Sequence, residues 1–492
     1  MAVRILVTGT TGYIGGRLVP RLLDAGHEVR ALARDPEKLR GVPWRDRVEV
    51  VRGDVTDAEA MAKACDDIDV LYYLVHSLQR SSFESVDRKG ALITADAARA
   101  AGVGRIVYLG GLRPSDGEDL SPHLASRSEV GEIFLRSGVP AAVFGAAVIL
   151  GAGSASFEML RYLTERLPVM VTPQWVDRRV QSIAVRDVLH YLVGAADLPS
   201  ELNRTFDIGG PDVLTYRQMM QRYAAVAELP HRRVLPVPFL TPKLSSHWVN
   251  VVTPVPRKLA APLIESLVHE MVCTEHDIAR YVPDPDGGLT PYDRAVELAL
   301  ARVRAGEVET RWSDAAVGDT PADPLPSDPD WSGGSAFVDE RRVEAAADPD
   351  RLWAVVTGIG GDNGWYSFPL AWSVRGWLDR LVGGVGLRRG RRNPARLQVG
   401  EALDWWRVEA LDDTGPERLL RLRAEMRVPG RAWLELGVSA GSDGGSVYRQ
   451  RAVFVPHGLA GQLYWWAVWP FHGIVFGGMT RNIVTAAERP AP

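Results

Sequence analysis

Three glycines near the start of the chain, Gly9, Gly12 and Gly15, have the G-x-x-G-x-x-G spacing of a phosphate-binding turn. The apolar run Val3–Val7 before them predicts a β-strand, and the apolar spacing after them predicts a helix. A tight turn brings backbone close to phosphate oxygens, and the free N–H groups at a helix start bind them. The spacing therefore predicts a dinucleotide pyrophosphate site, with a glycine-rich turn that binds nothing as the alternative. The predicted contacts are Gly9, Thr11, Gly12, Tyr13, Ile14 and Gly15.

An arginine indicates which dinucleotide is bound. Residues His27–Ala33 predict the second strand, and Arg34 is the first polar residue after it. An acidic side chain at this place would hold the ribose hydroxyls of NAD, whereas a guanidinium matches a 2′-phosphate. Arg34 would form a basic clamp with Arg17, so NADP is expected and NAD is not favoured. The alternative is a solvated surface arginine.

The elements that must position these residues alternate between strands and helices. A strand at 48–55, a strand in the run DVLYYLVHSL that ends at His76-Ser77, a helix at 83–101 and a strand at 105–109 follow in order. This order predicts an α/β fold with a doubly wound parallel Rossmann sheet. Ligands bind at the carboxyl ends of such strands. For His76, at the end of one of these strands, the alternative to a functional role is a structural hydrogen bond. The further cofactor contacts expected there are Asp54, Val55, His76, Ser77 and Gly110, with Asp54 and Val55 placed to lie beside the adenine.

Composition limits the class of protein. A net charge of −4 argues against a nucleic-acid partner. Cys65 and Cys273 lie far apart and have no metal-binding spacing, so we expect no metal site and a reducing cytoplasm. The start of the chain is a predicted core strand and does not have the pattern of a signal peptide.

The chain changes character after a linker. Residues 313–334 are rich in Pro, Asp, Ser and Gly and have no apolar periodicity, which predicts a linker. It would separate a nucleotide-binding domain at 1–312, with substrate or cap segments at about 150–305, from an α+β domain at 335–488. One strand is expected over 402–409, and an apolar helix closes the chain. Most of the fifteen tryptophans lie beyond Trp312, so the two ends are expected to do different work.

Four segments carry a resemblance to the extended and atypical short-chain dehydrogenase/reductase superfamily, close to its NmrA-like branch. They are the Gly9–Gly15 turn, Gly53-Asp54-Val55, Ile183-Ala184-Val185-Arg186-Asp187-Val188 and Asp207-Ile208-Gly209-Gly210. The resemblance covers Val3 to about Ala305 and implies an NAD(P)-binding Rossmann domain. The remainder resembles a bacterial domain of unknown function, on Trp365-Tyr366 and the run 465–472. Its order of elements is similar to the START-like helix-grip fold.

The sequence departs from the superfamily at the catalytic residues. The resemblance implies a serine after strand five and a Tyr-x-x-x-Lys pair, but here His123 and Arg127 occupy the i and i+4 positions. Arginine can hold a ribose but does not release its proton. Histidine, with an ordinary pKa of about 6.5, can act as a general acid near neutrality. We expect a modified proton relay here; the alternative is that His123 merely caps a helix and the domain binds cofactor without turnover.

Aromatic residues in the second domain have several interpretations. Some could line a cavity for an apolar ligand or form an ordinary core, namely Trp365, Tyr366, Trp372, Trp377, Trp405 and Trp406. The aromatic run of the C-terminal helix could also contact a membrane surface. An arginine cluster could face anionic lipid or simply be solvated, namely Arg388, Arg389, Arg391 and Arg392.

These patterns together predict an NADP-dependent oxidoreductase acting on a small apolar carbonyl, enone or quinone-like substrate. The alternative is a non-catalytic NADP(H)-binding sensor or assembly factor whose C-terminal domain binds a lipid-like ligand. The expected location is the cytoplasm, with membrane association through the C-terminal helix left open.

Overall fold

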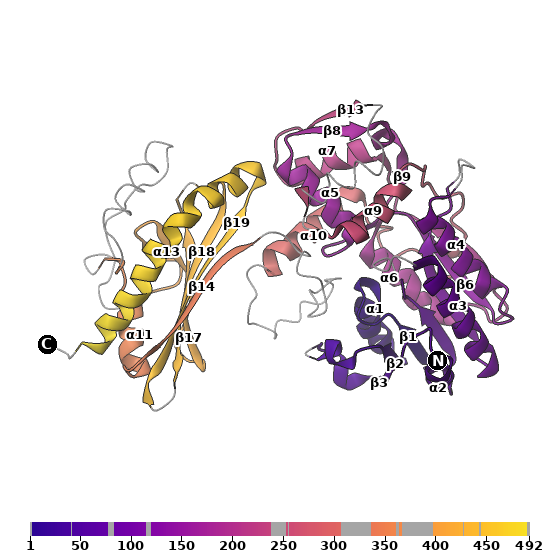
Figure 1. Cartoon of the computed structure of the whole chain (residues 1–492), viewed down its shortest axis with the longest axis horizontal. Coiled ribbons are helices and arrows are strands. Elements are labelled where there is room, and N and C mark those ends of the chain that lie inside the picture. The colour runs from indigo at the N-terminus through magenta and orange to yellow at the C-terminus, as the bar shows by residue number, and fades with distance from the viewer. Residues whose placement is uncertain are drawn as a thin grey trace. The chain divides into compact units, whose positions relative to one another are not determined.

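The computed structural model divides the chain into two compact units, Met1–Gly334 and Ser335–Pro492, each with its own sheet and core (Figure 1). The residues that it describes are 2–40, 42–76, 83–114, 120–237, 252–253, 255–306, 336–360, 364–366, 397–426, 428–441 and 444–489. The predicted linker, 313–334, lies outside the described residues.

The first unit is built on a seven-stranded sheet in the order β11-β6-β5-β4-β1-β2-β3, and every pair in it is parallel. Its strands are short and mostly apolar, as expected of a sheet covered on both faces. The predicted α/β doubly wound fold is therefore confirmed. The strands are β1 Arg4–Thr8, β2 Glu28–Ala33, β3 Glu49–Arg52, β4 Val70–Tyr73, β5 Arg105–Gly111, β6 Ala141–Ala146 and β11 Arg204–Ile208.

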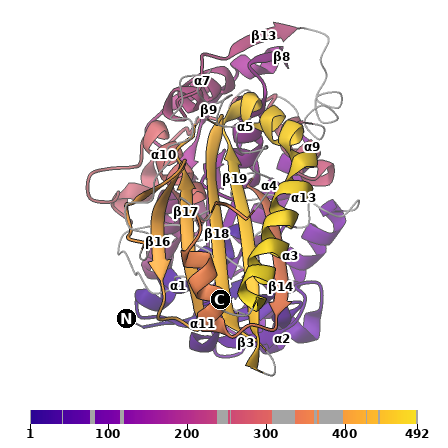
Figure 2. The same ribbon diagram turned by 90° about the vertical axis from the view of Figure 1, so that its left-hand side faces the viewer.

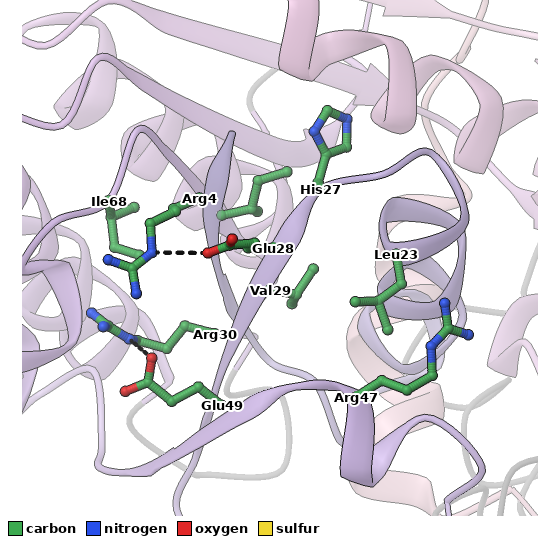
Figure 3. A pocket seen from close by; sticks show the side chains of 10 residues that line it. Arg4, Leu23, His27, Glu28, Val29, Arg30, Arg47, Glu49 and Ile68 are labelled. Atoms are coloured by element: carbon green, nitrogen blue, oxygen red, sulfur yellow. Dashed lines mark hydrogen bonds and ion pairs between the residues drawn. The ribbon is translucent and has the colours of Figure 1, made fainter. Parts of the chain in front are cut away.

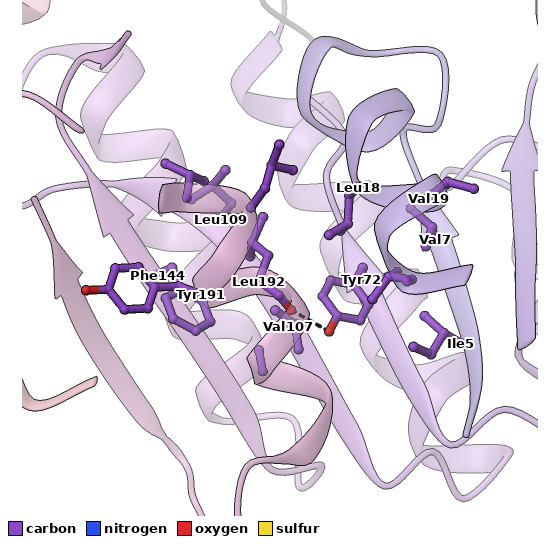
Figure 4. Packing of buried hydrophobic residues seen from close by; sticks show 14 of the residues in the cluster. Ile5, Val7, Leu18, Val19, Tyr72, Val107, Leu109, Phe144, Tyr191 and Leu192 are labelled. Atoms are coloured by element: carbon purple, nitrogen blue, oxygen red, sulfur yellow. Dashed lines mark hydrogen bonds between the residues drawn. The ribbon is translucent and has the colours of Figure 1, made fainter. Parts of the chain in front are cut away.

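Helices cover both faces of this sheet. Side chains alternate along each strand, so Ile5 and Val7 pack with α1 Tyr13–Asp24 and α6 Val185–Gly194. Leu6 packs on the opposite face. That face carries α2 Ala58–Cys65, α3 Phe83–Ala100 and α4 Pro122–Leu135. Figure 4 shows the first of these cores, where the Tyr72 hydroxyl of β4 donates to the Leu192 carbonyl of α6 at 2.7 Å.

A second lobe of the first unit, the cap, holds three two-stranded sheets, β7–β10, β9–β12 and β8–β13, and its own apolar core. Leu112 and Leu124 belong to that core, so the cap is packed onto the ends of β5 and α4. The cap elements are β7 Ile149–Leu150, α5 Ala155–Arg166, β8 Val169–Pro173, β9 Arg179–Gln181, β10 Ile183–Ala184, β12 Val213–Thr215, α7 Tyr216–Val226, β13 Arg233–Val237, α9 Arg257–Ser266 and α10 Tyr292–Gly306. Short 3-10 turns lie at Pro36–Leu39, Arg45–Arg47, Gln174–Asp177, Ala195–Asp197 and Asp277–Arg280.

The second unit is a six-stranded antiparallel sheet in the order β14-β19-β18-β17-β16-β15. Helices α11 Pro349–Thr357 and α13 Gly458–Glu488 share one apolar core with it and lie on the same side of the sheet (Figure 2). This confirms the α+β organisation, whereas the START-like likeness stays a prediction. The strands are β14 Phe337–Ala345, β15 Ala402–Leu403, β16 Trp406–Asp412, β17 Glu417–Ala424, β18 Gly430–Ala440 and β19 Ser446–Pro456.

One strand prediction in this unit is wrong. Residues 402–409 do not form a single strand, because β15 turns back onto β16 in a tight hairpin that pairs Leu403 with Trp406. The reversal occurs at Asp404, whose φ of 55° lies in the left-handed region. Aspartate tolerates this conformation better than most residues do, so the chain can reverse here without a glycine.

Candidate cofactor and catalytic site

The glycine turn that follows β1 has no room for side chains. Gly9 has a φ of +73°, and a Cβ placed on it would lie 2.5 Å from the Leu74 carbonyl oxygen. A Cβ on Gly15 would lie 2.3 Å from the carbonyl oxygen of Gly9. The Gly12 N–H donates to the same oxygen at 2.9 Å. Glycine is therefore required at Gly9 and Gly15 for the strand, turn and helix to pack this closely.

The start of α1 has the properties of an anion site. Its N-cap is Gly12, which supplies no side-chain capping bond, and its first turn contains no acidic residue. The N–H groups and the positive end of the helix dipole are thus available to negative charge. These features fit a dinucleotide pyrophosphate, held by the backbone of the turn from Gly9 to Gly15.

The structure corrects the predicted arginine clamp. Arg17 is buried: its guanidinium lies 4.2 Å from the centre of the Tyr13 ring and donates to the Tyr13 carbonyl at 3.1 Å. Its guanidinium therefore interacts within α1 and is not exposed beside Arg34 to bind a 2′-phosphate. Arg34, by contrast, is 67% exposed, with Asp54 Oδ2 at 4.0 Å.

Asp54 and Val55 are the residues expected beside the adenine, and Asp54 stabilises the turn that follows β3. Asp54 Oδ1 accepts from the Thr56 N–H at 2.9 Å and from the Thr56 hydroxyl at 2.8 Å. The Val55 side chain is buried in the core on the α2 and α3 face. Contact of this segment with an adenine stays a prediction.

A chain of three titratable side chains lies at the ends of β4, α3 and α4. His76 Nδ1 lies 3.1 Å from Asp87 Oδ2, and His76 Nε2 lies 3.3 Å from His123 Nδ1. His76 follows β4, whereas Asp87 and His123 come from the neighbouring helices α3 and α4. The structure therefore brings two predicted site residues together, although Ser77, the next one in the chain, lies outside the described residues.

Sequence reasoning missed Asp87. It lies near the amino end of α3, five residues into the helix, outside the motifs considered above. The only signal was the position of an acidic residue close to the amino end of a helix that follows His76.

The residue that caps the start of α4 is Ser121 and not His123. Ser121 is the N-cap and accepts from the Leu124 N–H at 3.3 Å, and Pro122 occupies the first turn. The suggestion that His123 merely caps the helix is therefore wrong. His123 is buried within the first turn.

Arg127 is anchored at the end of β5. One of its terminal N–H groups donates to the Leu109 carbonyl at 3.0 Å, and the Tyr108 hydroxyl donates to the Arg127 carbonyl at 3.2 Å. The Nε atom is buried and has no hydrogen-bond partner among the described residues. A buried donor of this kind is normally satisfied, so it fits a polar group of a bound cofactor. Gly110 follows Leu109 on β5, and a Cβ added to it would lie 3.0 Å from the Tyr108 ring.

Burial sets the charge state of the histidines. Desolvation, followed by the Arg127 charge and by His76, lowers the pKa of His123 to about 2. Desolvation and Arg127 also lower the pKa of His76, against the opposing effect of the Asp87 hydrogen bond. His123 is therefore neutral at pH 7, and the expectation of an ordinary pKa there is not met. A neutral imidazole can still donate or accept a hydrogen bond.

The acidic residues of the two later motifs are structural. Asp187 is buried and accepts from the N–H and the hydroxyl of Thr290 at 2.8 and 3.0 Å. Asp207 accepts from both groups of Thr274 at 2.8 Å. Asp187 thus fastens the segment at Thr290 to α6, and Asp207 fastens the segment at Thr274 to β11.

A pocket of about 270 Å³ is shown in Figure 3. Residues at the amino ends of β1, β2 and β3 line it, so it lies away from the carboxyl ends of the strands, where this site lies. Its charged side chains are paired, with Arg4 Nε 3.3 Å from Glu28 and Arg30 Nε 2.8 Å from Glu49. Ligands of doubly wound sheets bind at the carboxyl ends of the strands. We therefore place the candidate site at the glycine turn and α4, away from this pocket.

Three of the tryptophans expected to line a cavity or form a core belong to the apolar core of the second unit. Trp365, Trp405 and Trp406 are buried, and the first two stack with ring centres 5.4 Å apart. The Trp365 indole N–H donates to Asp404 at 2.7 Å. These three side chains therefore pack together in that core. Trp372, Trp377 and the four arginines, Arg388, Arg389, Arg391 and Arg392, lie outside the described residues.

Helix α13 exposes an apolar face. Leu463, Trp466, Phe471 and Ile474 are each more than 60% exposed. Within the described ranges, no helix has the length and hydropathy needed to cross a bilayer. The described residues also contain no group of three or more His, Cys, Asp or Glu arranged to hold a metal ion. Membrane contact through α13 stays a prediction.

Comparisons with known proteins match each unit separately. A family model described as "NAD(P)H-binding" matches residues 9–136. A second, described as "Protein of unknown function (DUF2867)", matches residues 331–479.

The curated relatives of this chain include reductases and a dehydrogenase. The (4-alkanoyl-5-oxo-2,5-dihydrofuran-3-yl)methyl phosphate reductase of Streptomyces griseus is 30% identical over 233 residues, covering 46% of this chain and 75% of the relative. The ceramide reductase of Caulobacter vibrioides is 32% identical over 201 residues, covering 40% and 61%. The 3 beta-hydroxysteroid dehydrogenase/Delta 5→4-isomerase of Mycobacterium tuberculosis is 33% identical over 138 residues, covering 24% of this chain. The chain spans 36% of the length of that dehydrogenase.

Proposed function

Because the chain belongs to the family of NAD(P)H-binding reductases of the short-chain dehydrogenase/reductase type, we propose that it is an NADP-dependent oxidoreductase of an apolar carbonyl, enone or quinone-like substrate. One observation carries the proposal. His123 and Arg127 lie one turn apart on α4, and Arg127 Nε has no hydrogen-bond partner within the part of the chain that the structure describes. Both residues lie at the carboxyl ends of the strands of the sheet, where α1 also begins without a side-chain cap.

The preference for NADP rests on the end of β2. Arg34 is exposed there and can pair with a 2′-phosphate. The neighbouring carboxylate, Asp35, accepts from the Glu37 N–H at 3.3 Å and so caps the short helix that follows.

Two side chains of α4, Arg127 and His123, would contact the cofactor and the substrate. A bound nicotinamide supplies a hydride. Arg127, fixed by the Leu109 carbonyl, would use its Nε–H to hold a polar group of the cofactor. His123 would form a hydrogen bond with the substrate oxygen and supply its proton.

An apolar substrate is supported by the surroundings of His123. Leu124, the next residue on α4, lies in the apolar core that joins α4 to the cap, with Leu112 and Val148. Two of the relatives are named for a steroid and a ceramide, which are both largely apolar molecules.

Turnover tests the proposal. The purified chain is incubated with NADPH and a panel of apolar ketones, enones and quinones, and loss of cofactor absorbance is recorded. We expect turnover with at least one class, and a fall in kcat of about 100-fold in His123→Ala with unchanged NADPH affinity. The control is His231→Ala, which changes an exposed histidine of the cap.

Two results would contradict it. Tight NADPH binding without turnover across the whole panel would favour the sensor or assembly factor. Turnover that His123→Ala leaves unchanged would remove His123 from the reaction.

A further inference from the structure

Asp87, His76 and His123 form one continuous hydrogen-bonded chain across three elements of the first unit. We propose that this chain is a proton relay that carries a proton from solvent to the carbonyl oxygen of the substrate, with Asp87 and His76 acting through His123. The inference rests on the proposed function and deepens it, because it names the bond that is reduced as C=O.

The hydrogen-bonding rules of the three groups fix the order of the protons. An ionised Asp87 only accepts, so the Nδ1 atom of His76 carries a hydrogen. When His76 is neutral its Nε2 is an acceptor, so His123 donates from Nδ1 and its own Nε2 is left as a lone pair. When His76 holds one extra proton, both of its nitrogens donate, His123 accepts at Nδ1, and Nε2–H of His123 becomes a donor. One proton added to His76 therefore converts the far atom of His123 from acceptor to donor.

Burial shows where that proton enters. The His76 side chain is 21% exposed, whereas that of Asp87 is 5% exposed and His123 as a residue is 4% exposed. His123 cannot easily exchange protons with water itself, and His76 provides the contact with solvent. The relay thus joins a buried donor to the surface through one hydrogen bond.

The charges around the relay act in opposite directions. The carboxylate of Asp87 on α3 favours the protonated form of His76, and the guanidinium of Arg127 on α4 disfavours it. Among the described residues, Tyr73 of β4 and Tyr108 of β5 also lie close enough to interact with Asp87, and burial raises the pKa of Tyr108 to about 12. Both phenols are neutral at pH 7, so Asp87 is the charge that opposes Arg127.

The proton balance of reduction follows from this order. The carbonyl carbon would take the hydride that a bound reduced nicotinamide supplies, and the π electron pair of C=O would move to the oxygen. That oxygen takes the proton on His123 Nε2, and His123 Nδ1 takes the proton on His76 Nε2. His76 keeps its Nδ1–H bond to Asp87 and regains one proton from water. Each turnover consumes one hydride and one proton and forms an alcohol.

Asp87→Asn is the central test. Asparagine can still accept from His76 Nδ1 through its amide oxygen but lacks the charge that favours protonated His76. We expect kcat for ketone reduction to fall about 10- to 100-fold, with NADPH affinity unchanged. The rate falls as pH rises through the apparent pKa of the relay, and this limb should move to lower pH by about one unit in Asp87→Asn. His76→Gln should lose the same activity, and Asp87→Glu should recover part of it.

The matched control is Asp96→Asn, a change to an exposed carboxylate on the same helix, which pairs with Arg99. It should leave both kcat and the pH limb unchanged. Wild-type kcat and an unmoved limb in Asp87→Asn and His76→Gln would overturn the relay while the proposed function stands.

A second readout needs no turnover. In ¹⁵N–¹H spectra of the histidine rings of the NADP-loaded protein, Asp87→Asn should shift the ring nitrogens of His123, because the hydrogen bonds of His76 connect the two side chains. Unchanged His123 resonances in that variant would also overturn the relay. If the wild type reduces no carbonyl compound, the proposed function fails and the relay fails with it as a catalytic device.

Discussion

Nε2 of His76 lies 3.3 Å from Nδ1 of His123, although the two residues are 47 positions apart in the chain. The contact forms because the end of β4 and the start of α4 meet at the same edge of the sheet. His123 is buried there, and burial disfavours the protonated form of its ring and so lowers its pKa.

The stability of the protein should therefore depend on pH through His123. Burial and Arg127 lower its pKa from 6.5 to about 2, so between these values the unfolded chain binds a proton that the folded protein does not. The stability associated with this group is complete above pH 6.5 and is lost as pH falls. Between pH 7 and pH 5 we expect the free energy of unfolding to fall by about 2 kcal/mol from this residue.

Denaturant titrations at pH 7 and pH 5 measure this effect, with His123→Gln as the comparison. The variant should lose less stability on acidification than the wild type does. His231→Gln, at an exposed position, should behave like the wild type. An identical pH dependence in the wild type and His123→Gln would contradict the buried, neutral histidine.

Gly15→Ala should abolish cofactor binding. The new Cβ would lie 2.3 Å from the Gly9 carbonyl oxygen, which is backbone and cannot move without opening the turn. We expect no measurable NADPH binding by fluorescence titration, and a loss of about 2 kcal/mol in the free energy of unfolding. Gly473→Ala, where a Cβ meets nothing within 4 Å, is the control. Normal NADPH affinity in Gly15→Ala would show that the turn is not the pyrophosphate site.

Arg34→Ala should change cofactor preference. Removing a charge-assisted hydrogen bond to the 2′-phosphate costs about 1.5–3 kcal/mol, so NADPH affinity should fall by about 10- to 100-fold. NADH affinity should stay the same. Calorimetric titration with both cofactors measures the difference, and Arg136→Ala, on another exposed arginine, is the control. Equal losses for the two cofactors would contradict recognition of the 2′-phosphate.

Trp365→Phe should destabilise the second unit. The Trp365 indole N–H donates to the buried carboxylate of Asp404 at 2.7 Å, and phenylalanine has no donor. Loss of a partner to a buried charged group costs about 2–3 kcal/mol, which a denaturant titration detects. Trp466→Phe, at a position that is 62% exposed, should cost less than about 0.5 kcal/mol. Equal stabilities of the two variants would show that the bond to Asp404 contributes nothing.

The fold of the first unit follows from local patterns. Short apolar strands alternate with amphipathic helices, and this order permits few arrangements other than a doubly wound parallel sheet. The glycine turn is likewise local, because strand, turn and helix are contiguous from Arg4 to Asp24. Both features could therefore be predicted from the sequence.

The missed features depend on contacts that are distant in sequence. Asp87 joins the site only because α3 packs against α4, and the low pKa of His123 arises from burial that no local pattern encodes. Arg17 turns toward Tyr13 on the preceding turn of its own helix. The reversal at Asp404 depends on a backbone conformation that aspartate adopts only in some contexts.

Deuterium transfer tests the central claim most directly. The protein is incubated with NADPH carrying deuterium at C4 of the nicotinamide and with apolar ketones, and the alcohol products are examined by mass spectrometry. We predict one deuterium on the carbinol carbon of at least one product, formed about 100-fold more slowly by His123→Ala. Saturating NADPH binding with no deuterium in any product would contradict the assignment of this chain as a carbonyl reductase.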